Sequence, residues 1–352
     1  FFYCAFSQLQ TADCKLVIVN SLFNALVQKM KYLIVYGSCG HGHQRAAEYI
    51  GEELRSRGHT AVSVIDFLNY ASSFFKRAYP FIYKYSVTHV PWLWKIGFDI
   101  TNIKQIHPLI QVIRRVANRL HAGKMEKYFV EENPDIIILT HFLPSEICAY
   151  LRRSKKITST VITVITDTVA HATWINKGND HFIGFSDQTR EELVKWGILE
   201  SRIHVLGIPI SPKFTLKHKT REYREKHGLK PDLFTVLLTS GSFGMGPIEK
   251  IIDILNQYCG ELQIAVVCGN NGALLKRLAA KTFCVHVRVF PFIDFMDELM
   301  EASNIIITKS GGLTMCESLA KELPMIITRP IPGQETYNAD FLLEHAAAFR
   351  IY

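Results

Sequence analysis

The sequence predicts an α/β protein with two Rossmann-like domains, and three observations support this. Short apolar runs alternate with amphipathic segments in both halves of the chain, as in parallel strands joined by crossover helices. A polar, proline-containing stretch at 210–232 interrupts the alternation. The chain has 352 residues, more than one ordinary core contains. We therefore predict a first domain over 30–209, a linker over 210–232 and a second domain over 233–352.

The first half of the chain carries six short apolar runs that we predict to be strands. The clearest is 32–36 (YLIVY), which is typical of a strand buried on both faces of a sheet. The others are residues 61–65, 136–140, 161–166, 182–185 and 203–207. A glycine-rich turn at 37–43 and an amphipathic helix from Gln44 to about Arg57 follow the first strand. This alternation predicts a parallel sheet covered by helices on both faces.

The second half repeats the pattern after the linker, which we expect to include a solvated helix. Its predicted strands are residues 235–238, 264–268, 285–289, 304–308 and 325–328. The sequence stops at Tyr352, soon after a predicted helix, so we expect the second domain to be cut short. Ligands in open α/β sheets bind beyond the carboxyl ends of the strands, so the loops there should line an interdomain cleft.

Residues 1–29 are predicted to lie outside the fold. The apolar run at 16–27 lacks the basic start and the small-residue cleavage site of a signal peptide. A start at Met30, directly before the first strand, fits the pattern better. No apolar run reaches the roughly 18–20 residues that a membrane-spanning helix needs.

The charge and the cysteines narrow the choice of partners. A net charge of +8 favours an anionic partner, such as nucleic acid, an acidic membrane surface or a phosphorylated substrate. The eight cysteines include no C-x-x-C pair and no Cys/His spacing typical of a metal site, so no metal is expected. We interpret them as free thiols in a reducing cytosol.

The segment 308–338 carries the most specific signal. A strand leads into a Ser-Gly-Gly turn at 310–312, where a helix begins. Glycines at such a junction free backbone N–H groups to face an anion, with the helix dipole behind them. Glu317, within that helix, can accept hydrogen bonds from two sugar hydroxyls, and a Gln-Glu pair at 334–335 follows the next strand. The arrangement predicts a site for a nucleotide sugar.

Gly42 and His43 lie where the first strand passes into a helix. Glycine lets a ligand approach the backbone there, and a helix N-terminus disfavours a charged imidazole. His43 would stay neutral near pH 7, as a general base must, although a capping or packing histidine is the alternative. By the same strand-end rule, Asp167 is either catalytic or a cap of the turn that follows it.

Two further turns follow predicted strands of the second domain. Residues 240–246 (SGSFGMG) resemble a phosphate-cradling turn, with a tight strand-to-helix connection as the alternative. Residues 290–294 (FPFID) suit a planar base held by backbone hydrogen bonds and apolar packing, and they suit a plain core equally well.

Residues 66–123 show no strand pattern but combine aromatic and basic side chains. Those that we single out are Phe74, Phe75, Lys76, Arg77, Trp92 and Trp94. This combination suits a membrane interface, and a helical insertion whose aromatic side chains pack inward is an equal alternative. A platform for single-stranded nucleic acid shares the composition, but nothing else in the chain supports one, so no nucleic acid is expected as a partner.

Taken in order, these motifs resemble the lipid-directed glycosyltransferases of family 28. The turn ending in His43, VITDTVAHATW at 164–174, LGIPI at 206–210, the 240–246 loop, VVCGNN, FPFID and the segment 308–338 follow the order of the family. From about Lys31 to the C-terminus, the chain resembles the monogalactosyldiacylglycerol synthases and bacterial diacylglycerol glucosyltransferases. The resemblance implies the GT-B fold and inverting transfer from a UDP-sugar, with no tightly held metal or other cofactor.

The resemblance also implies roles for single residues. Glu317 would hold the ribose hydroxyls, the backbone at Ile293 the uracil, and His43 would be the base or the group that organises the transition state. The residues whose N–H groups would meet the diphosphate are Ser242, Phe243, Gly311, Gly312, Leu313 and Thr314. The residues at the donor hexose would be Gln334, Glu335 and Asn338.

We therefore expect an enzyme that transfers glucose or galactose from a UDP-sugar to the free hydroxyl of diacylglycerol. It would be cytoplasmic and peripheral on the inner face of the cell membrane, docked on anionic lipid. One alternative keeps the fold but uses a polyprenyl-linked acceptor, or hydrolyses or epimerises the UDP-sugar. Another is a non-catalytic UDP-sugar sensor or membrane adaptor.

Overall fold

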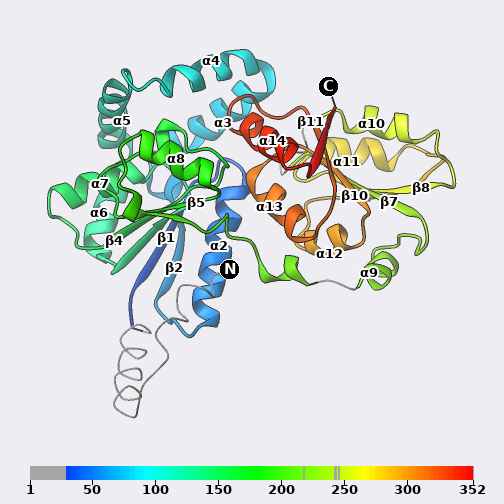
Figure 1. The fold of residues 1–352 in the computed structure, drawn as a ribbon, viewed down its shortest axis with the longest axis horizontal. Coiled ribbons are helices and arrows are strands. Elements are labelled where there is room, and N and C mark those ends of the chain that lie inside the picture. The colour runs from blue at the N-terminus through cyan, green and yellow to red at the C-terminus, as the bar shows by residue number, and fades with distance from the viewer. Residues whose placement is uncertain (1–28, 217–218, 242–243, 245, 352) are drawn as a thin grey trace, which may run out of the picture. The chain divides into compact units, whose positions relative to one another are not determined.

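The computed structural model describes residues 29–351 apart from 217–218, 242–243 and 245 (Figure 1). The predicted extra segment 1–29 lies outside the described residues except for Lys29. The chain divides between Pro209 and Ile210 into two compact units, and the short segments Gly40–Gly42 and Tyr85–Lys95 group with the second unit.

The first unit is built on a six-stranded sheet in the order β2-β1-β3-β4-β5-β6. Its strands are β1 (Tyr32–Tyr36), β2 (Val62–Asp66), β3 (Ile136–Leu139), β4 (Thr160–Val164), β5 (His181–Gly184) and β6 (Ile203–Val205). All neighbouring pairs are parallel. Leu33 and Val35 pack in one hydrophobic cluster while Tyr32 and Ile34 pack in another, so β1 is buried on both faces. A strand without a polar face must be covered twice, which confirms the predicted parallel sheet.

Helices connect these strands and cover the sheet. They are α2 (His41–Ser56), η2 (Phe67–Tyr70), α3 (Ser73–His89), α4 (Pro91–Thr101), α5 (His107–His121), α6 (Gly123–Glu132), α7 (Ser145–Arg153), η3 (Ala172–Trp174), α8 (Asp187–Lys195) and η4 (Glu200–Arg202). The predicted start of the first helix at Gln44 is wrong, because α2 begins at His41. Gly40 takes a φ of 126°, which turns the backbone so that the helix starts at once. His43 therefore lies in the first turn of α2.

The segment predicted to lack strands forms α3, α4 and α5, and its aromatic side chains divide between packed and exposed positions. Phe75, Tyr79 and Tyr83 pack against the core of the first unit. Phe74 and Trp92, by contrast, are 73% and 64% exposed. Of the other residues singled out, Trp94 is partly buried and the basic ones are exposed: Lys76 and Arg77. One set of aromatic side chains thus anchors the insertion to the core, and another set is exposed on its surface.

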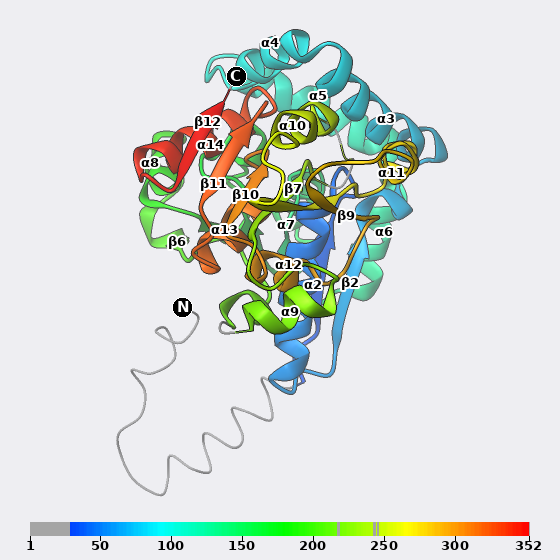
Figure 2. The same ribbon diagram turned by 90° about the vertical axis from the view of Figure 1, so that its right-hand side faces the viewer.

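The second unit is built on a parallel six-stranded sheet in the order β12-β11-β10-β7-β8-β9. Its elements are η5 (Pro212–Thr215), α9 (Thr220–Lys226), β7 (Phe234–Thr239), α10 (Ile248–Leu255), β8 (Leu262–Val267), α11 (Gly272–Ala279), β9 (His286–Phe290), α12 (Met296–Glu301), β10 (Ile305–Thr308), α13 (Gly312–Ala320), β11 (Met325–Thr328), α14 (Gln334–Glu344) and β12 (Ala348–Ile351). Figure 2 shows α10 and α11 on one side of β7 and β8, and α12 and α13 on the other. The sheet is therefore covered on both faces, like that of the first unit.

One strand of the second unit was not predicted, and one predicted helix has an additional packing contact. The final strand, β12, was not predicted; it pairs with β11 at the sheet edge, where a short run that includes Arg350 is tolerated. The helix α9, predicted as a solvated helix, is mostly exposed and packs on α12 along one side. Arg224 of α9 is buried and donates to the carbonyl oxygens of Ala302 and Pro231, at 2.8 and 2.6 Å. These bonds tie α9 to the second unit.

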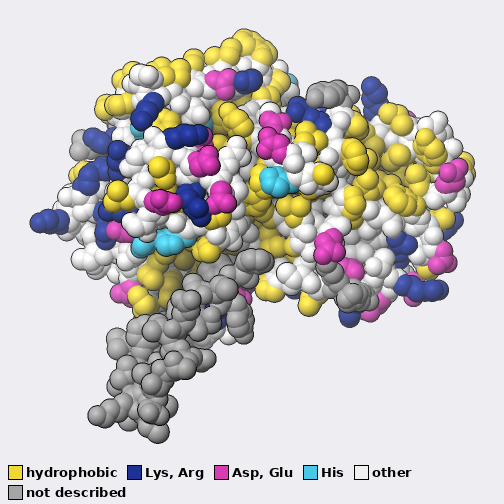
Figure 3. All heavy atoms as spheres, in the orientation of Figure 1, with side chains coloured by type: hydrophobic (Ala, Val, Ile, Leu, Met, Phe, Trp, Pro, Cys, Tyr) yellow, Lys and Arg dark blue, Asp and Glu magenta, His cyan; other side chains and the backbone are white. Residues whose placement is uncertain are grey.

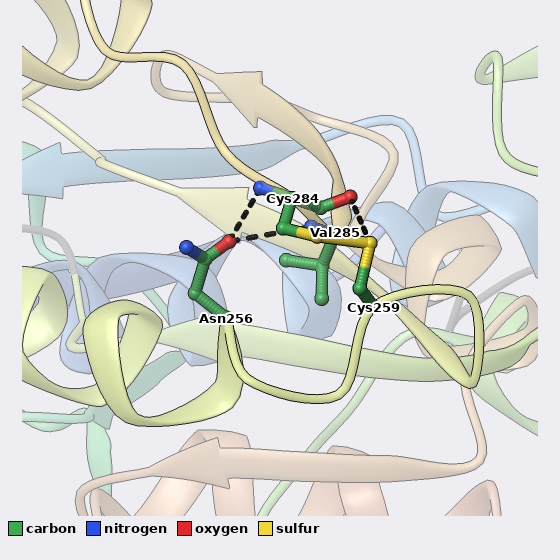
Figure 4. Close-up of a disulfide and its surroundings, with 4 residues drawn as sticks. All are labelled: Asn256, Cys259, Cys284 and Val285. Atoms are coloured by element: carbon green, nitrogen blue, oxygen red, sulfur yellow. Dashed lines mark hydrogen bonds between the residues drawn. A yellow bond between two sulfur atoms is a disulfide. The ribbon is translucent and has the colours of Figure 1, made fainter.

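The interpretation of all cysteines as free thiols is wrong, because Cys259 and Cys284 form a disulfide (Figure 4). Cys259 precedes β8 and Cys284 precedes β9, and parallel neighbours in a sheet begin side by side, so the two Cα atoms lie 5.3 Å apart. The side-chain oxygen of Asn256 accepts from the backbone N–H groups of Cys284 and Val285 at 2.7 and 3.2 Å, which fixes the same corner. The described cysteines that remain free are all buried: Cys39, Cys148, Cys268 and Cys316.

Each sheet has one place where the strand order reverses direction. In the first unit it lies between β1 and β3, and in the second between β7 and β10. The loops that leave the carboxyl ends of such a strand pair run to opposite sides and leave room for a ligand. No helix among the described residues combines the length and the apolarity needed to cross a membrane.

Candidate active site

The switch point of the first unit brings together two histidines, from α2 and from the loop after β3. Gly37, directly after β1, makes room for His141, because a Cβ atom there would lie 3.1 Å from Cγ of its ring. The ring of His43 meets that of His141 edge-on, with centroids 4.6 Å apart. His141 was not predicted, although its place after the strand 136–140 is a signal that the strand-end rule could have used.

Hydrogen bonds fix the orientation of the His43 ring. Its Nδ1 is 2.7 Å from the carbonyl oxygen of Thr140 and 3.0 Å from Oγ1 of Thr166. A carbonyl oxygen can only accept, so in the neutral ring Nδ1 carries the proton and the lone pair is on Nε2. The hydroxyl of Thr140 also donates to the carbonyl oxygen of His43 at 2.8 Å. Thr140 thus holds His43 by both its side chain and its backbone.

Both imidazoles are kept neutral by their surroundings. Burial lowers the pKa of His43 to about 4, and the hydrogen bond to Thr140 opposes that shift only in part. Burial, helped by the neighbouring His43 and Arg114, holds the pKa of His141 well below its usual range. His141 Nδ1 accepts from the backbone N–H of Leu143 at 3.1 Å. His43 Nε2 is therefore the nitrogen suited to accept a proton from a substrate.

Asp167 lies in the segment that reaches the same switch point. The residue before it, Thr166, contacts His43, and Asp167 itself is partly buried. The residues after it hold the fold together: the carbonyl oxygen of Thr168 accepts from Thr189 Oγ1 at 2.6 Å, and His171 Nε2 lies 2.9 Å from the carbonyl oxygen of Phe98. The catalytic role of Asp167 stays a prediction.

The switch point of the second unit combines glycines with a helix N-terminus. Gly311 precedes α13, and no side chain caps this helix in the described part of the chain. The first backbone N–H groups of a helix have no partner within it, and in α13 they belong to Gly312, Leu313 and Thr314. They are three of the four groups at this turn that the family resemblance assigned to a diphosphate. The N–H of the fourth, Gly311, instead donates to the carbonyl oxygen of Lys309 at 3.0 Å. Open N–H groups at the start of a helix can bind an anion.

The loop after β7 lies across the switch point from α13. Gly241 and Gly244 have φ angles of 67° and 55°, so both need glycine. A Cβ atom on Gly244 would also lie 2.1 Å from the carbonyl oxygen of Cys268, because the loop packs closely on the end of β8. Ser242 and Phe243, which were assigned to the diphosphate, lie outside the described residues. Ile293, assigned to the base, follows β9 and is partly buried.

Hydrogen bonds join the turn after β10 to α14. The buried hydroxyl of Ser310 donates to the carbonyl oxygen of Glu335 at 2.5 Å, and the Asn338 amide donates to the carbonyl oxygen of Ser310 at 2.9 Å. One carboxylate oxygen of Glu335 lies 2.5 Å from Lys309 Nζ, and the other accepts from the N–H of Ile331 at 2.9 Å. Asn338 and Glu335 therefore hold the loop in place, and their role at the donor hexose stays a prediction.

Two predicted donor residues carry the chemistry that a sugar needs. Glu317 is a buried carboxylate in α13. Gln334 begins α14, and its Oε1 is buried and accepts no hydrogen bond from the residues that the structure describes. A buried amide oxygen without a partner costs free energy unless a ligand group satisfies it, so a ligand hydroxyl suits this position.

Comparison with known proteins covers nearly the whole chain. Residues 43–210 match the family described as monogalactosyldiacylglycerol (MGDG) synthase, and residues 235–351 match the glycosyltransferase family 28 C-terminal domain. A processive diacylglycerol beta-glucosyltransferase of Staphylococcus haemolyticus is 30% identical over 89% of this chain and 79% of its own length. Monogalactosyldiacylglycerol synthase 2 of Arabidopsis thaliana, a chloroplastic protein, is 30% identical over 90% of this chain and 69% of its own length.

Solved structures show the same fold at low sequence identity. MurG of Acinetobacter baumannii has a TM-score of 0.54 at 14% identity, covering 92% of this chain and 86% of its own. The glycotransferase of kitacinnamycin has a TM-score of 0.58 at 12% identity, covering 91% and 86%. With the two parallel sheets, these likenesses confirm the predicted α/β, GT-B fold.

Proposed function

Because the chain belongs to the family of diacylglycerol glycosyltransferases that includes the monogalactosyldiacylglycerol synthases, we propose that it transfers glucose or galactose from a UDP-sugar to the free hydroxyl of diacylglycerol. The observation that carries this proposal is the similarity over most of the chain to two enzymes named for different sugars. Both names share diacylglycerol. The acceptor is therefore the better supported half of the proposal.

In the proposed reaction, the acceptor hydroxyl oxygen attacks C1 of the hexose from the face opposite UDP. The new O–C1 bond forms as the bond from C1 to the β-phosphate oxygen breaks, and its electron pair leaves with UDP. His43 Nε2 accepts the hydroxyl proton, since Nδ1 is engaged by Thr140. With a pKa of about 4, His43 is a weak base, so the proton moves late, when the forming bond has made it acidic. Displacement from the opposite face inverts C1.

On the donor side, the proposal assigns the diphosphate to the open N–H groups at the start of α13. Glu317 would accept from the ribose hydroxyls, and Gln334 Oε1 from a hexose hydroxyl. Fixed N–H dipoles stabilise the charge that develops on the leaving UDP without having to reorganise during the reaction.

For the membrane, we assign the exposed apolar surface of α3 and α5. On α5 the side chains at one helical face are each more than half exposed: Leu109, Val112, Ile113, Val116 and Leu120. Phe74 of α3 adjoins this stripe, since its ring lies 6.1 Å from that of His121 at the end of α5. Hydrophobic side chains also gather over the neighbouring α4, along the top of Figure 3. A helix with an exposed apolar stripe suits the lipid interface, and the net charge of +8 favours an anionic leaflet such as the inner face of the cell membrane.

The test uses the purified chain with vesicles that contain dioleoylglycerol, with and without anionic phosphatidylglycerol, and labelled UDP-glucose or UDP-galactose in turn. We expect a β-linked hexosyl-diacylglycerol, identified by mass and by its anomeric proton, and more of it on anionic vesicles. A parallel reaction with polyprenyl phosphate tests the alternative acceptor. Binding of UDP without product on any lipid would instead favour a non-catalytic UDP-sugar sensor.

A further inference from the structure

We propose that Lys309 supplies a positive charge to the β-phosphate of the departing UDP, an inference that rests on the proposed function. Lys309 follows β10 directly and stands at the switch point between β10 and β7. It is not among the residues that the sequence motifs assigned to the donor. The role of Lys309 can be inferred only from the residues of other loops that lie beside it in the structure.

The ammonium of Lys309 lies between two loops of the second unit. Nζ is 2.5 Å from Glu335 Oε1, and the lysine side chain is 19% exposed. On the other side, a Cβ atom on Gly241 would lie 2.7 Å from Cε and 3.6 Å from Nζ of Lys309. Gly241 belongs to the turn after β7, so the ammonium reaches the edge of that turn. Lys309 thus connects the predicted phosphate turn, the start of α13 and the loop that begins α14.

The electrostatics of this position favour an anion. A lysine at the N-terminal end of a helix is unfavourable by itself, because the helix dipole is positive there. Glu335 compensates that charge in the present structure. A diphosphate carries more negative charge than one carboxylate, and we expect it to draw Nζ away from Glu335. Glu335 keeps its bond from the N–H of Ile331, so its carboxylate stays in place and Oε1 becomes free for a hexose hydroxyl.

A second buried ion pair in the same unit contains a lysine whose contacts are all with the protein, and it serves for comparison. Lys321, just after α13, lies 3.0 Å from Glu301, and both side chains are buried. Its Nζ also donates to the carbonyl oxygen of Leu216, so the protein satisfies it on two sides. Lys321 follows the C-terminal end of α13 and Lys309 precedes the N-terminal end. Lys321 is therefore the matched control for Lys309.

The experiment measures the affinity of the full chain for uridine, UMP and UDP by titration calorimetry. It compares the wild type with Lys309→Met, with Lys309→Met combined with Glu335→Gln, and with Lys321→Met. We expect the preference for UDP over UMP to fall about tenfold or more in both Lys309 variants, the size of a lost charge-assisted hydrogen bond. Uridine affinity should not change, and Lys321→Met should keep the wild-type preference.

The double variant decides whether Lys309 acts on the ligand or only on Glu335. It leaves no unpaired buried carboxylate, so it also serves if Lys309→Met alone fails to fold. A wild-type preference for UDP in the double variant would overturn the inference, because Lys309 would then only neutralise Glu335. A wild type that binds no UDP would overturn the proposed function and the inference together. Loss of the preference in both Lys309 variants supports the inference.

Discussion

The two switch points share one topology but differ in the chemistry of their loops. In the first unit the loops after β1 and β3 bring together two imidazoles that burial keeps neutral, His43 and His141. In the second unit the loops after β7 and β10 present glycines, open N–H groups and Lys309, which pairs with Glu335 of α14. A neutral nitrogen suits the transfer of a proton, and fixed dipoles with a paired charge suit an anion. The comparison shows that the order of the strands determines where a site can form, and that the residues of the loops determine its chemistry.

Of the changes that test this comparison, removing the His43 imidazole should have the largest effect on the reaction rate. In His43→Ala we expect kcat to fall about 100- to 10,000-fold, the usual contribution of general-base catalysis. UDP affinity, measured by calorimetry, should stay within about twofold, because the donor groups lie on the second unit. His345→Ala, at an exposed histidine just after α14, serves as the control. A near-normal kcat in His43→Ala would exclude His43 as the base.

The pH dependence of kcat/KM tests the neutrality of the first switch point. The base acts when unprotonated, and burial lowers the pKa of His43 to about 4, so the active form persists as the pH falls to about 5. A histidine with an ordinary pKa of about 6.5 would lose roughly thirtyfold over the same range. We expect a nearly flat acid limb down to about pH 5 and a decline toward pH 4. Return to pH 7.5 must restore full activity, and a midpoint near 6.5 would contradict the neutral His43.

Glu317→Gln should change donor recognition at the second switch point without changing the first. We expect UDP affinity to fall about tenfold, since the amide replaces one carboxylate oxygen that would accept from a ribose hydroxyl. The wild type should prefer UDP over 2′-deoxy-UDP, and the variant should lose most of that preference. Equal discrimination in both proteins would move the ribose contact to another residue.

The smallest effect is expected from the hydroxyl of Thr166, which lies 3.0 Å from His43 Nδ1. Thr166→Val keeps the shape and loses the hydrogen bond, so we expect kcat to fall severalfold while KM for the donor is unchanged. Thr166→Ser should restore kcat because it restores the hydroxyl. Equal rates for the Ser and Val variants would show that this contact does not position His43.

Much of this fold could be predicted because parallel strands buried on both faces are continuous apolar runs. The runs at β1 and β11 were predicted to the residue, and the place of His43 after β1 made it the candidate base. The start of α2 was predicted too late, since Gly42 and the histidines beside it have low helix propensity. The stripe of exposed side chains on α5 has the same spacing as a buried one, so the sequence could not say which way it faces.

The partners of the remaining residues come from distant parts of the chain. The importance of Lys309 depends on Glu335 and Gly241, and only the meeting of three loops reveals it. Likewise, the disulfide joins Cys259 and Cys284, which are 25 residues apart and become neighbours only because β8 and β9 begin side by side. Neither the contacts of Lys309 nor the disulfide can be predicted from the spacing of these residues along the chain.

The exposed stripe of α5 has a kinetic consequence if it rests on lipid. An enzyme held at a bilayer searches for its acceptor in two dimensions, so its rate follows the mole fraction of diacylglycerol in the surface and is insensitive to the total lipid in the tube. Diluting the acceptor with inert phospholipid would slow the enzyme, while adding more vesicles of the same composition would leave its rate per bound molecule unchanged. The rate of glycolipid synthesis would then depend on the composition of the membrane to which α5 binds.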